Sequence, residues 1–244
     1  MSIALKNVWG TTHTGYQRSR NEDRFLIKPL QENQAILLGV ADGMGGEAGG
    51  DISAQIVVDN LQKYQTPSET IEQDLTDILD KAGKEIRLRV EKEIKLDGMG
   101  TTATVVLVSN GMAYWSHVGD SRLYLSRKRE FRQITIDHTF VQDLIEDGTL
   151  SQYDADRHPL RNMLDQCVGY TDMIPDSGRF SVQPGDAVLL CSDGLTRQVS
   201  DDKIKATLDI GNARKASEKL VKAALKAGGI DNVTAVVLIY GSVS

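Results

Sequence analysis

Apolar residues fall into short continuous runs, and turn-forming residues separate them. Runs typical of β-strands cover residues 5–12, 24–27, 35–40, 101–109, 112–118, 122–126, 131–136, 188–191 and 233–240. The run at 35–40 is almost wholly apolar, which predicts a strand buried on both faces. Asn110 and Gly111 separate two runs and strongly favour a tight hairpin. Because the runs from 101 to 136 follow one another as a meander, we expect largely antiparallel sheets, and we expect Pro29 to end the strand at 24–27.

Other segments repeat apolar residues every three or four positions, which is typical of helices packed on one face. They cover about 54–61, 68–96, 140–146 and 215–226.

The chain from 148 to 176 is polar and weakly periodic, and it contains Pro159 and Pro175. A stretch of this length inside a compact domain predicts a surface excursion or lid.

Composition narrows the class of protein. A chain of 244 residues that is 40% hydrophobic fits a single domain, 1–244, with one large core. The net charge of −6 and the lack of a Lys/Arg run argue against nucleic-acid binding. No apolar segment approaches the roughly 20 residues that span a membrane. Cys167 and Cys191 form no disulfide framework and the start does not resemble a signal peptide, so we expect a cytoplasmic monomer.

An acidic residue recurs beside the apolar runs. Asp42 precedes Gly43 directly after the 35–40 run, and Asp120, Asp193 and Asp231 each adjoin another run. A strand that ends in Asp-Gly places a carboxylate and a freely turning backbone at the rim of a sheet. One such pair is most often a turn with a capping acid. Their recurrence favours a shared site.

The candidate metal ligands at these positions are oxygen atoms. Two carboxylates 4 Å apart repel by about 4 kcal/mol at an effective dielectric of about 20, so a cluster of them needs cations or protons. The chain has no Cys-x-x-Cys pair and no His-Glu-x-x-His, which argues against a zinc site. Oxygen ligands suit Mg²⁺ or Mn²⁺, and two such ions can lower the pKa of a shared water and present it to phosphorus.

A set of motifs occurs in a specific order along nearly the whole chain. They are Arg18…Asn21-Glu22-Asp23, Val40-Ala41-Asp42-Gly43-Met44-Gly45-Gly46, Met99-Gly100-Thr101-Thr102, His117-Val118-Gly119-Asp120-Ser121-Arg122, Asp137-His138-Thr139, Cys191-Ser192-Asp193-Gly194-Leu195 and Asp231-Asn232-Val233-Thr234. With these motifs the chain resembles the metal-dependent Ser/Thr protein phosphatases of the PPM (PP2C-type) family in their compact bacterial form.

The resemblance implies a fold, an activity and partners. The fold is α+β: a four-layer α/β/β/α sandwich of two stacked antiparallel sheets flanked by helices, with a flap inserted at about 140–176. The implied activity is hydrolysis of phosphoserine and phosphothreonine in proteins by direct attack of a water or hydroxide that bridges two metal ions. The implied cofactors are two core Mn²⁺ or Mg²⁺ ions and a third, weaker one. The implied partners are phosphorylated proteins, the substrates of Ser/Thr kinases.

The family's metal-binding roles carry over onto matching positions of this chain. The resemblance implies that Asp42 bridges both core ions and that the carbonyl of Gly43 binds the first. It implies that Asp193 and Asp231 bind the second ion. Asp120 matches the acid that holds the third, weaker ion in bacterial members.

The remaining roles concern water and phosphate. Asp23 is expected to hold metal-bound waters, with Glu22 nearby. Arg18 is expected to bind the substrate phosphate, because a planar guanidinium presents several donors to phosphate oxygens. Arg20 is close enough in sequence to be the next candidate for that role.

Some positions depart from the family pattern. Met44 stands where some members have a histidine, and Glu47 where many bacterial relatives have one, so the leaving-group acid is unassigned and water is the default. His13 stands where relatives often carry Asp, and we interpret it as an ordinary surface or strand residue. His117 and His138 are interpreted as structural.

Two alternatives come from other mechanisms. Residues 191–197 satisfy Cys-x-x-Gly-x-x-Arg, the loop of cysteine-dependent phosphatases that would use Cys191 and Arg197. Asp193 would then place a carboxylate inside a loop that holds a dianion, which argues against this alternative. The other is a catalytically weak pseudophosphatase that binds phosphoproteins. Inactive relatives usually lose a metal-binding acid, whereas this chain keeps them all.

Overall fold

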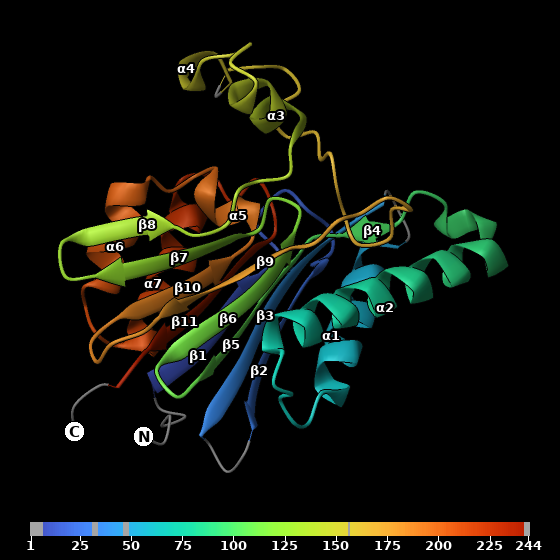
Figure 1. The fold of residues 1–244 in the computed structure, drawn as a ribbon. Helices are drawn as coiled ribbons and strands as arrows, with labels where there is room; N and C mark the ends of the chain where they lie inside the picture. Colours follow the sequence, from blue (N-terminus) through green and yellow to red (C-terminus); the bar gives the residue numbers. More distant parts are fainter. Residues whose placement is uncertain (1–6, 31–33, 46–48, 156, 242–244) are drawn as a thin grey trace.

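Two antiparallel sheets lie face to face, with helices on both outer faces (Figure 1). The computed structural model describes residues 7–30, 34–45, 49–155 and 157–241. The expected four-layer sandwich is therefore confirmed. No helix within these ranges is both long and apolar enough to cross a lipid bilayer.

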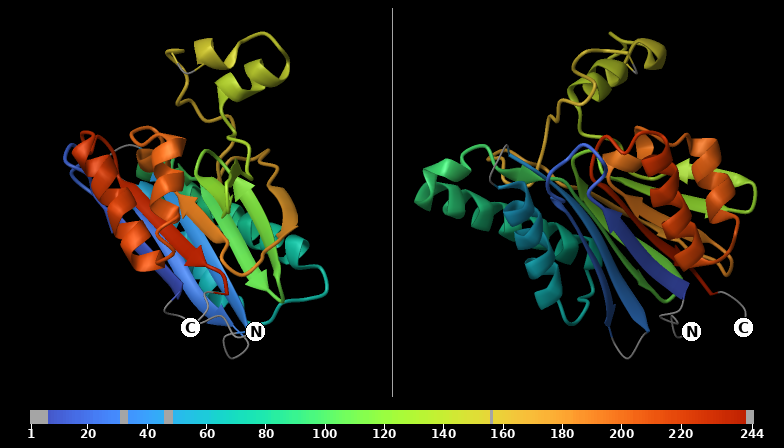
Figure 2. Two further views of the ribbon diagram at one scale, coloured as in Figure 1. Left: turned by 90° about the vertical axis from the view of Figure 1, so that its left-hand side faces the viewer. Right: turned by 180° about the vertical axis from the view of Figure 1, so that it is seen from behind.

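The first sheet has the strand order β1-β11-β10-β7-β8. Its strands are β1 (Val8–His13), β11 (Val233–Ile239), β10 (Ala187–Cys191), β7 (Arg122–Arg127) and β8 (Glu130–Gln133). The helices α5 (Asp193–Thr196), α6 (Asp201–Leu208) and α7 (Ala213–Lys226) lie on its outer side, as the view from behind shows (Figure 2).

The second sheet has the strand order β2-β3-β5-β6-β9, and a short strand, β4, also pairs with β3. Its strands are β2 (Asp23–Leu30), β3 (Ala35–Met44), β4 (Gly100–Thr101), β5 (Ala103–Ser109), β6 (Met112–Val118) and β9 (Asp176–Ser181). The helices α1 (Gly50–Lys63) and α2 (Ile71–Lys92) cover it, and the short 3-10 helix η3 (Ile94–Leu96) follows α2.

The interior strand β3 contributes to two layers of the core. Ile36 and Leu38 pack between the sheets, whereas Leu37 packs beneath α1 and α2. Successive side chains of a strand point to opposite faces, so a strand covered on both sides must be apolar throughout. Full burial of a leucine stabilises the fold by about 1.5–3 kcal/mol. The burial of the 35–40 run on both faces confirms the prediction from its continuous apolar character.

A segment with two helices, α3 (Phe140–Glu146) and α4 (Gln152–Ala155), rises from one end of the sandwich between β8 and β9 (Figures 1 and 2). Its two stems are joined at the base. Phe140 donates its N–H to the carbonyl of Met163 at 2.9 Å, and Asp165 donates to the carbonyl of His138 at 3.0 Å. The excursion expected from the polar stretch at 148–176 lies here, and its description omits residue 156.

Two strand boundaries differ from the prediction. Pro29 does not end a strand: β2 continues to Leu30, with Pro29 opposite Ile36. Its place on β2 is typical of proline within sheets, since β2 is an edge strand. The strand expected at 131–136 ends at Gln133, where the Gln133 side chain donates to the carbonyl of Thr135 and helps turn the chain.

Some elements lacked a usable sequence signal. The edge strand β9 alternates exposed and half-buried positions and carries few apolar residues, and no strand was predicted there. The helix α6 is only eight residues long and was not predicted. The long helix expected at 68–96 is α2, which ends at Lys92, followed by the separate turn η3.

Candidate active site

Strand pairing brings the predicted acids to one end of the sandwich. Asp23 and Asp42 are direct partners across β2 and β3. The end of β10 pairs with the start of β11, so Asp193 and Asp231 emerge side by side. The end of β10 also pairs with the start of β7, which Asp120 precedes by two residues. The spatial cluster is therefore a consequence of antiparallel register.

A cavity of about 900 Å³ opens at this end. Its lining residues include Arg18, Arg20, Glu22, Asp42, Gly43, Met44, Asp120, Asp193, Arg197 and Asp231, together with Asn162, Met163 and Leu164 from the projecting segment. Asp23 is not in the lining and is only 2% exposed. Of the predicted site residues, all but Asp23 thus face one cavity.

Asp42 is held through its backbone. Its N–H donates to the hydroxyl of Thr102 at 3.0 Å, and its carbonyl accepts from the Thr102 N–H at 2.9 Å. The sequence suggested that the strand ends at Asp42, but β3 continues through Gly43 to Met44. Gly43 is needed for close packing, because a Cβ there would overlap the carbonyl oxygen of Gly50 at the start of α1.

Asp23 lies beneath the cavity in a polar niche. Its Oδ2 accepts hydrogen bonds from the Ser192 hydroxyl at 2.8 Å and from the Thr234 hydroxyl at 2.7 Å. Its Oδ1 is buried and has no partner, and the same holds for Oδ1 of Asp193. Buried carboxylate oxygens without a donor are rare, so both atoms fit a cation or its hydration water. Sequence reasoning gave Ser192 and Thr234 no role, although both stand inside the quoted motifs.

Burial and, after it, mutual repulsion raise the pKa values of the clustered acids. Burial, and then the charges of Asp23, Asp193, Asp120 and Asp231, raise the pKa of Asp42 well above its usual range. Burial likewise raises the pKa of Asp23 to about 7 and that of Asp120 to about 8. The cluster therefore retains protons unless a cation replaces them.

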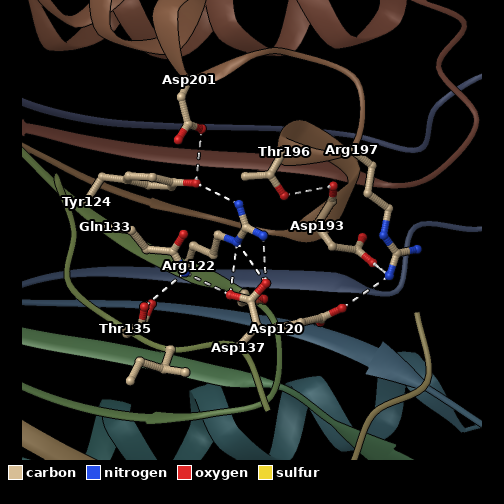
Figure 3. Close-up of polar contacts among 12 residues, drawn as sticks. Asp120, Arg122, Tyr124, Gln133, Thr135, Asp137, Asp193, Thr196, Arg197 and Asp201 are labelled. Carbon is tan, nitrogen blue, oxygen red and sulfur yellow. Dashed lines mark hydrogen bonds and ion pairs between the residues drawn. The ribbon is translucent and has the colours of Figure 1, made fainter. Parts of the chain in front are cut away.

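Two arginines supply positive charge to the cluster. Nη2 of Arg18 lies 2.9 Å from Oδ2 of Asp231. Arg197 contacts Asp193 and lies 3.1 Å from Oδ2 of Asp120 (Figure 3). The sequence placed Arg197 only in the cysteine-phosphatase loop. Its spacing of four residues from Asp193 on a helical turn was the signal that could have found this contact.

The carboxylates are close but are not already arranged as ligands. Across the described residues, no three Asp, Glu, His or Cys side chains have the geometry to hold a metal ion. Guanidinium groups instead contact oxygens of Asp231, Asp193 and Asp120. The oxygen-only donors and the partnerless oxygens of Asp23 and Asp193 nevertheless fit a divalent cation.

Asn232 fastens the loop that carries Arg18. Its Oδ1 accepts from the N–H of Glu22, and its Nδ2 donates to the carbonyls of Thr14 and Arg20, each at 2.8 Å. Gly194 packs against the same residue, because a Cβ there would overlap the Asn232 carbonyl oxygen. The Asp-Asn motif therefore joins the Arg18 loop to the acid cluster, a role that the sequence did not reveal.

The histidines lie away from the reacting centre or are fully engaged. His117 is buried between the Thr104 hydroxyl and the Ile136 carbonyl, and burial lowers its pKa to about 3. His138 bonds the turn at Gly119, as expected of a structural residue. His13 is exposed at the end of β1.

The structure describes one of the two positions at which some relatives carry a histidine. Met44 lines the cavity, but a thioether cannot donate a proton. Glu47 lies outside the described residues.

The structure argues against the cysteine mechanism. Cys191 is fully buried in β10, between Arg122 and Ala235 of the neighbouring strands. Burial raises its pKa to about 12, so it would not be a thiolate at neutral pH.

Comparisons with known proteins define the class. The family model for protein phosphatase 2C matches residues 9–226. The chain belongs to this family, which confirms the resemblance stated from its motifs. It is similar to the serine/threonine protein phosphatase PstP of Mycobacterium tuberculosis, with 37% identity over 88% of this chain, and it spans 43% of that protein's length.

Two further relatives extend the comparison. Protein phosphatase PhpP of Streptococcus pneumoniae is 34% identical over 91% of this chain and 93% of its own length. The crystal structure of the PstP catalytic domain in complex with two manganese ions is 35% identical, with a TM-score of 0.82 over 94% of this chain and 96% of that one.

The raised pKa values predict how the metal-free protein responds to pH. A carboxyl whose folded pKa exceeds its unfolded value near 3.9 adds stability at low pH, and that stability is lost as pH rises through the folded pKa. With Asp23 near 7 and Asp120 near 8, we expect the melting temperature in EDTA to fall by several degrees between about pH 6.5 and 8.5. Buried His117, whose pKa is lowered, changes the stability in the opposite direction as pH rises, but only at pH values below this window.

Scanning calorimetry at several pH values checks this. The fall of the melting temperature with pH should be smaller in Asp23→Asn. It should also be smaller in saturating Mn²⁺ than in EDTA. A melting temperature that rises across this window without metal would contradict the prediction.

Proposed function

We propose that the protein is a metal-dependent phosphatase that hydrolyses phosphoserine and phosphothreonine in proteins. The observation that carries the proposal is the gathering of three cavity acids and buried Asp23 around Asp42, with Arg18 on the same cavity, in a protein phosphatase 2C chain. The relatives named above are serine/threonine protein phosphatases, which supports this substrate class.

In this proposal the acids divide the metal-binding work. Asp42 and the Gly43 carbonyl would hold the core ions together with Asp193 and Asp231. Asp23 would hold metal-bound water, since its buried Oδ1 is an acceptor that no protein group uses. When bound, two divalent ions supply charge neutralisation at phosphorus and a water of lowered pKa. Manganese has the support of the PstP catalytic domain, and magnesium is proposed on ligand chemistry alone.

Arg18 is proposed to position the phosphate. Its side chain is 54% exposed at the cavity, and its partner Asp231 is 21% exposed. An exposed ion pair is weak, so the guanidinium can exchange this carboxylate for a substrate phosphate once a cation neutralises Asp231. Glu22, from the same loop, lies against the first residue of α1 and supports the phosphate side of the cavity.

The leaving oxygen is proposed to take its proton from water. Within the described lining of the cavity there is no histidine, and Met44 has no proton to give.

We also propose a third, weaker ion at Asp120. We place the protein in the cytoplasm as a monomer that opposes Ser/Thr kinases, and its two buried free cysteines are compatible with a reducing compartment.

The activity should depend on divalent metal. We expect turnover of p-nitrophenyl phosphate and of a phosphothreonine peptide with Mn²⁺, loss of both in EDTA, and loss of turnover in Asp42→Asn, which removes the shared ligand. Steady-state kinetics after dialysis measures this. Cys191→Ser is the matched control and should keep most of the activity. Full turnover in EDTA would refute the metal mechanism, and a folded, metal-bound but inactive protein would indicate a pseudophosphatase.

Arg18 should act mainly on phosphate affinity. We expect Arg18→Ala to raise KM for a phosphopeptide by roughly tenfold or more, because a charge-assisted contact is worth on the order of 1.5–3 kcal/mol. Peptide kinetics with saturating Mn²⁺ checks this, with Arg20→Ala as the neighbouring control. Unchanged kinetics in Arg18→Ala, with a raised KM in Arg20→Ala, would transfer the role to Arg20.

The projecting segment should matter more for proteins than for small substrates. It places Met163 and Leu164 on the cavity, while Arg157, His158 and Arg161 lie in the same segment. We expect Arg161→Ala to lower kcat/KM for a phosphopeptide several-fold and to leave p-nitrophenyl phosphate nearly unaffected. Arg214→Ala, on the outer helix α7, is the control. Equal effects on both substrates would make the segment purely structural.

A further inference from the structure

Arg197 joins two acids that come from different parts of the fold. It caps the C-terminus of the short helix α5, and its side chain contacts Asp193 one turn earlier. The same nitrogen, Nη2, lies 3.1 Å from Oδ2 of Asp120, in the turn before β7 (Figure 3). Both carboxylate side chains are buried, at 12% and 9% exposed. The guanidinium therefore provides a positive charge between two buried negative ones.

The neighbouring arginine does not share this task. Arg122 donates to both oxygens of Asp137 at 2.7–2.9 Å and to the Tyr124 hydroxyl at 3.0 Å (Figure 3). Arg122 thus forms a separate ion pair with Asp137 within the sandwich. The charge that reaches both Asp120 and Asp193 is that of Arg197.

We propose that the guanidinium of Arg197 is a tethered cation that holds the place of the third, weakly bound divalent ion, and that this ion binds at Asp120 only when Arg197 withdraws. The inference rests on the proposed function, in which Asp193 binds a core ion and Asp120 the weaker one. The Arg197 side chain is 30% exposed and therefore borders solvent, and in this proposal it turns outward when the ion binds. The arginine thus keeps the metal-free cluster neutralised and lowers the affinity for the third ion.

Calorimetric titration of Mn²⁺ into metal-free protein tests the competition. We expect Arg197→Gln to bind the weakest ion about tenfold or more tightly than the wild type, because a competing positive charge has gone, with no loss of the core ions. The double variant Asp120→Ala with Arg197→Gln should lose this gain. An unchanged weakest affinity in Arg197→Gln would overturn the inference.

The same titration separates this inference from the proposed function. If the proposed function is wrong, the wild type binds no Mn²⁺, or Asp42→Asn binds it as the wild type does. If only the inference is wrong, binding depends on Asp42 but not on Arg197. Arg197→Lys keeps the charge but loses the planar fork, so it should shift the weakest affinity in the same direction by a smaller factor. An affinity in Arg197→Lys that is tighter than in Arg197→Gln would count against competition by charge.

Thermal melting gives a readout that does not depend on activity. Arg127 pairs with buried Asp186 at the far end of β7, and its side chain is 24% exposed, so Arg127→Gln is a matched control. We expect Arg197→Gln to melt several degrees below the wild type in EDTA and to match it in saturating Mn²⁺. Arg127→Gln should lose stability equally in both. Equal losses for Arg197→Gln with and without Mn²⁺ would show an ordinary structural ion pair and overturn the inference.

Discussion

The repulsion among carboxylates at one end of the sandwich is the constraint on which the site depends. Asp42 lies within the fields of four other acids, and burial intensifies each interaction. The fold can hold such a group only because its backbone is fixed by strand pairing on both sides of β3. Protons, guanidinium groups and metal ions are the available ways to relieve the repulsion, and each defines a different state of the protein.

Close backbone contact makes the cluster rigid. Gly43 against Gly50, and Gly194 against Asn232, leave no room for a Cβ. These glycines bring α1 and the Asp231 loop into direct contact with the strand ends that carry the acids. Main-chain packing therefore fixes the strand ends that carry the acids, whereas Arg18 and Arg197 reach the acids through long, partly exposed side chains.

Much of the fold and the acid set could be predicted from the sequence, for identifiable reasons. The apolar run of β3 and the Asn110-Gly111 hairpin are local signals, and the motifs around Asp42, Asp193 and Asp231 are specific in combination. The edge strand β9 escaped because its polar alternation resembles a loop. The contact of Arg197 with Asp120 escaped because it joins positions 77 residues apart in the sequence, which no local pattern encodes.

Pro29 has a consequence for how the molecule meets other copies of itself. It lies near the end of β2, the outermost strand of its sheet, where an exposed row of backbone donors would invite another strand. A proline within an edge strand has no N–H to offer, and proline is one of the residues that discourage another strand from pairing there. Pro29 thus helps protect a long, apolar sheet from edge-to-edge aggregation.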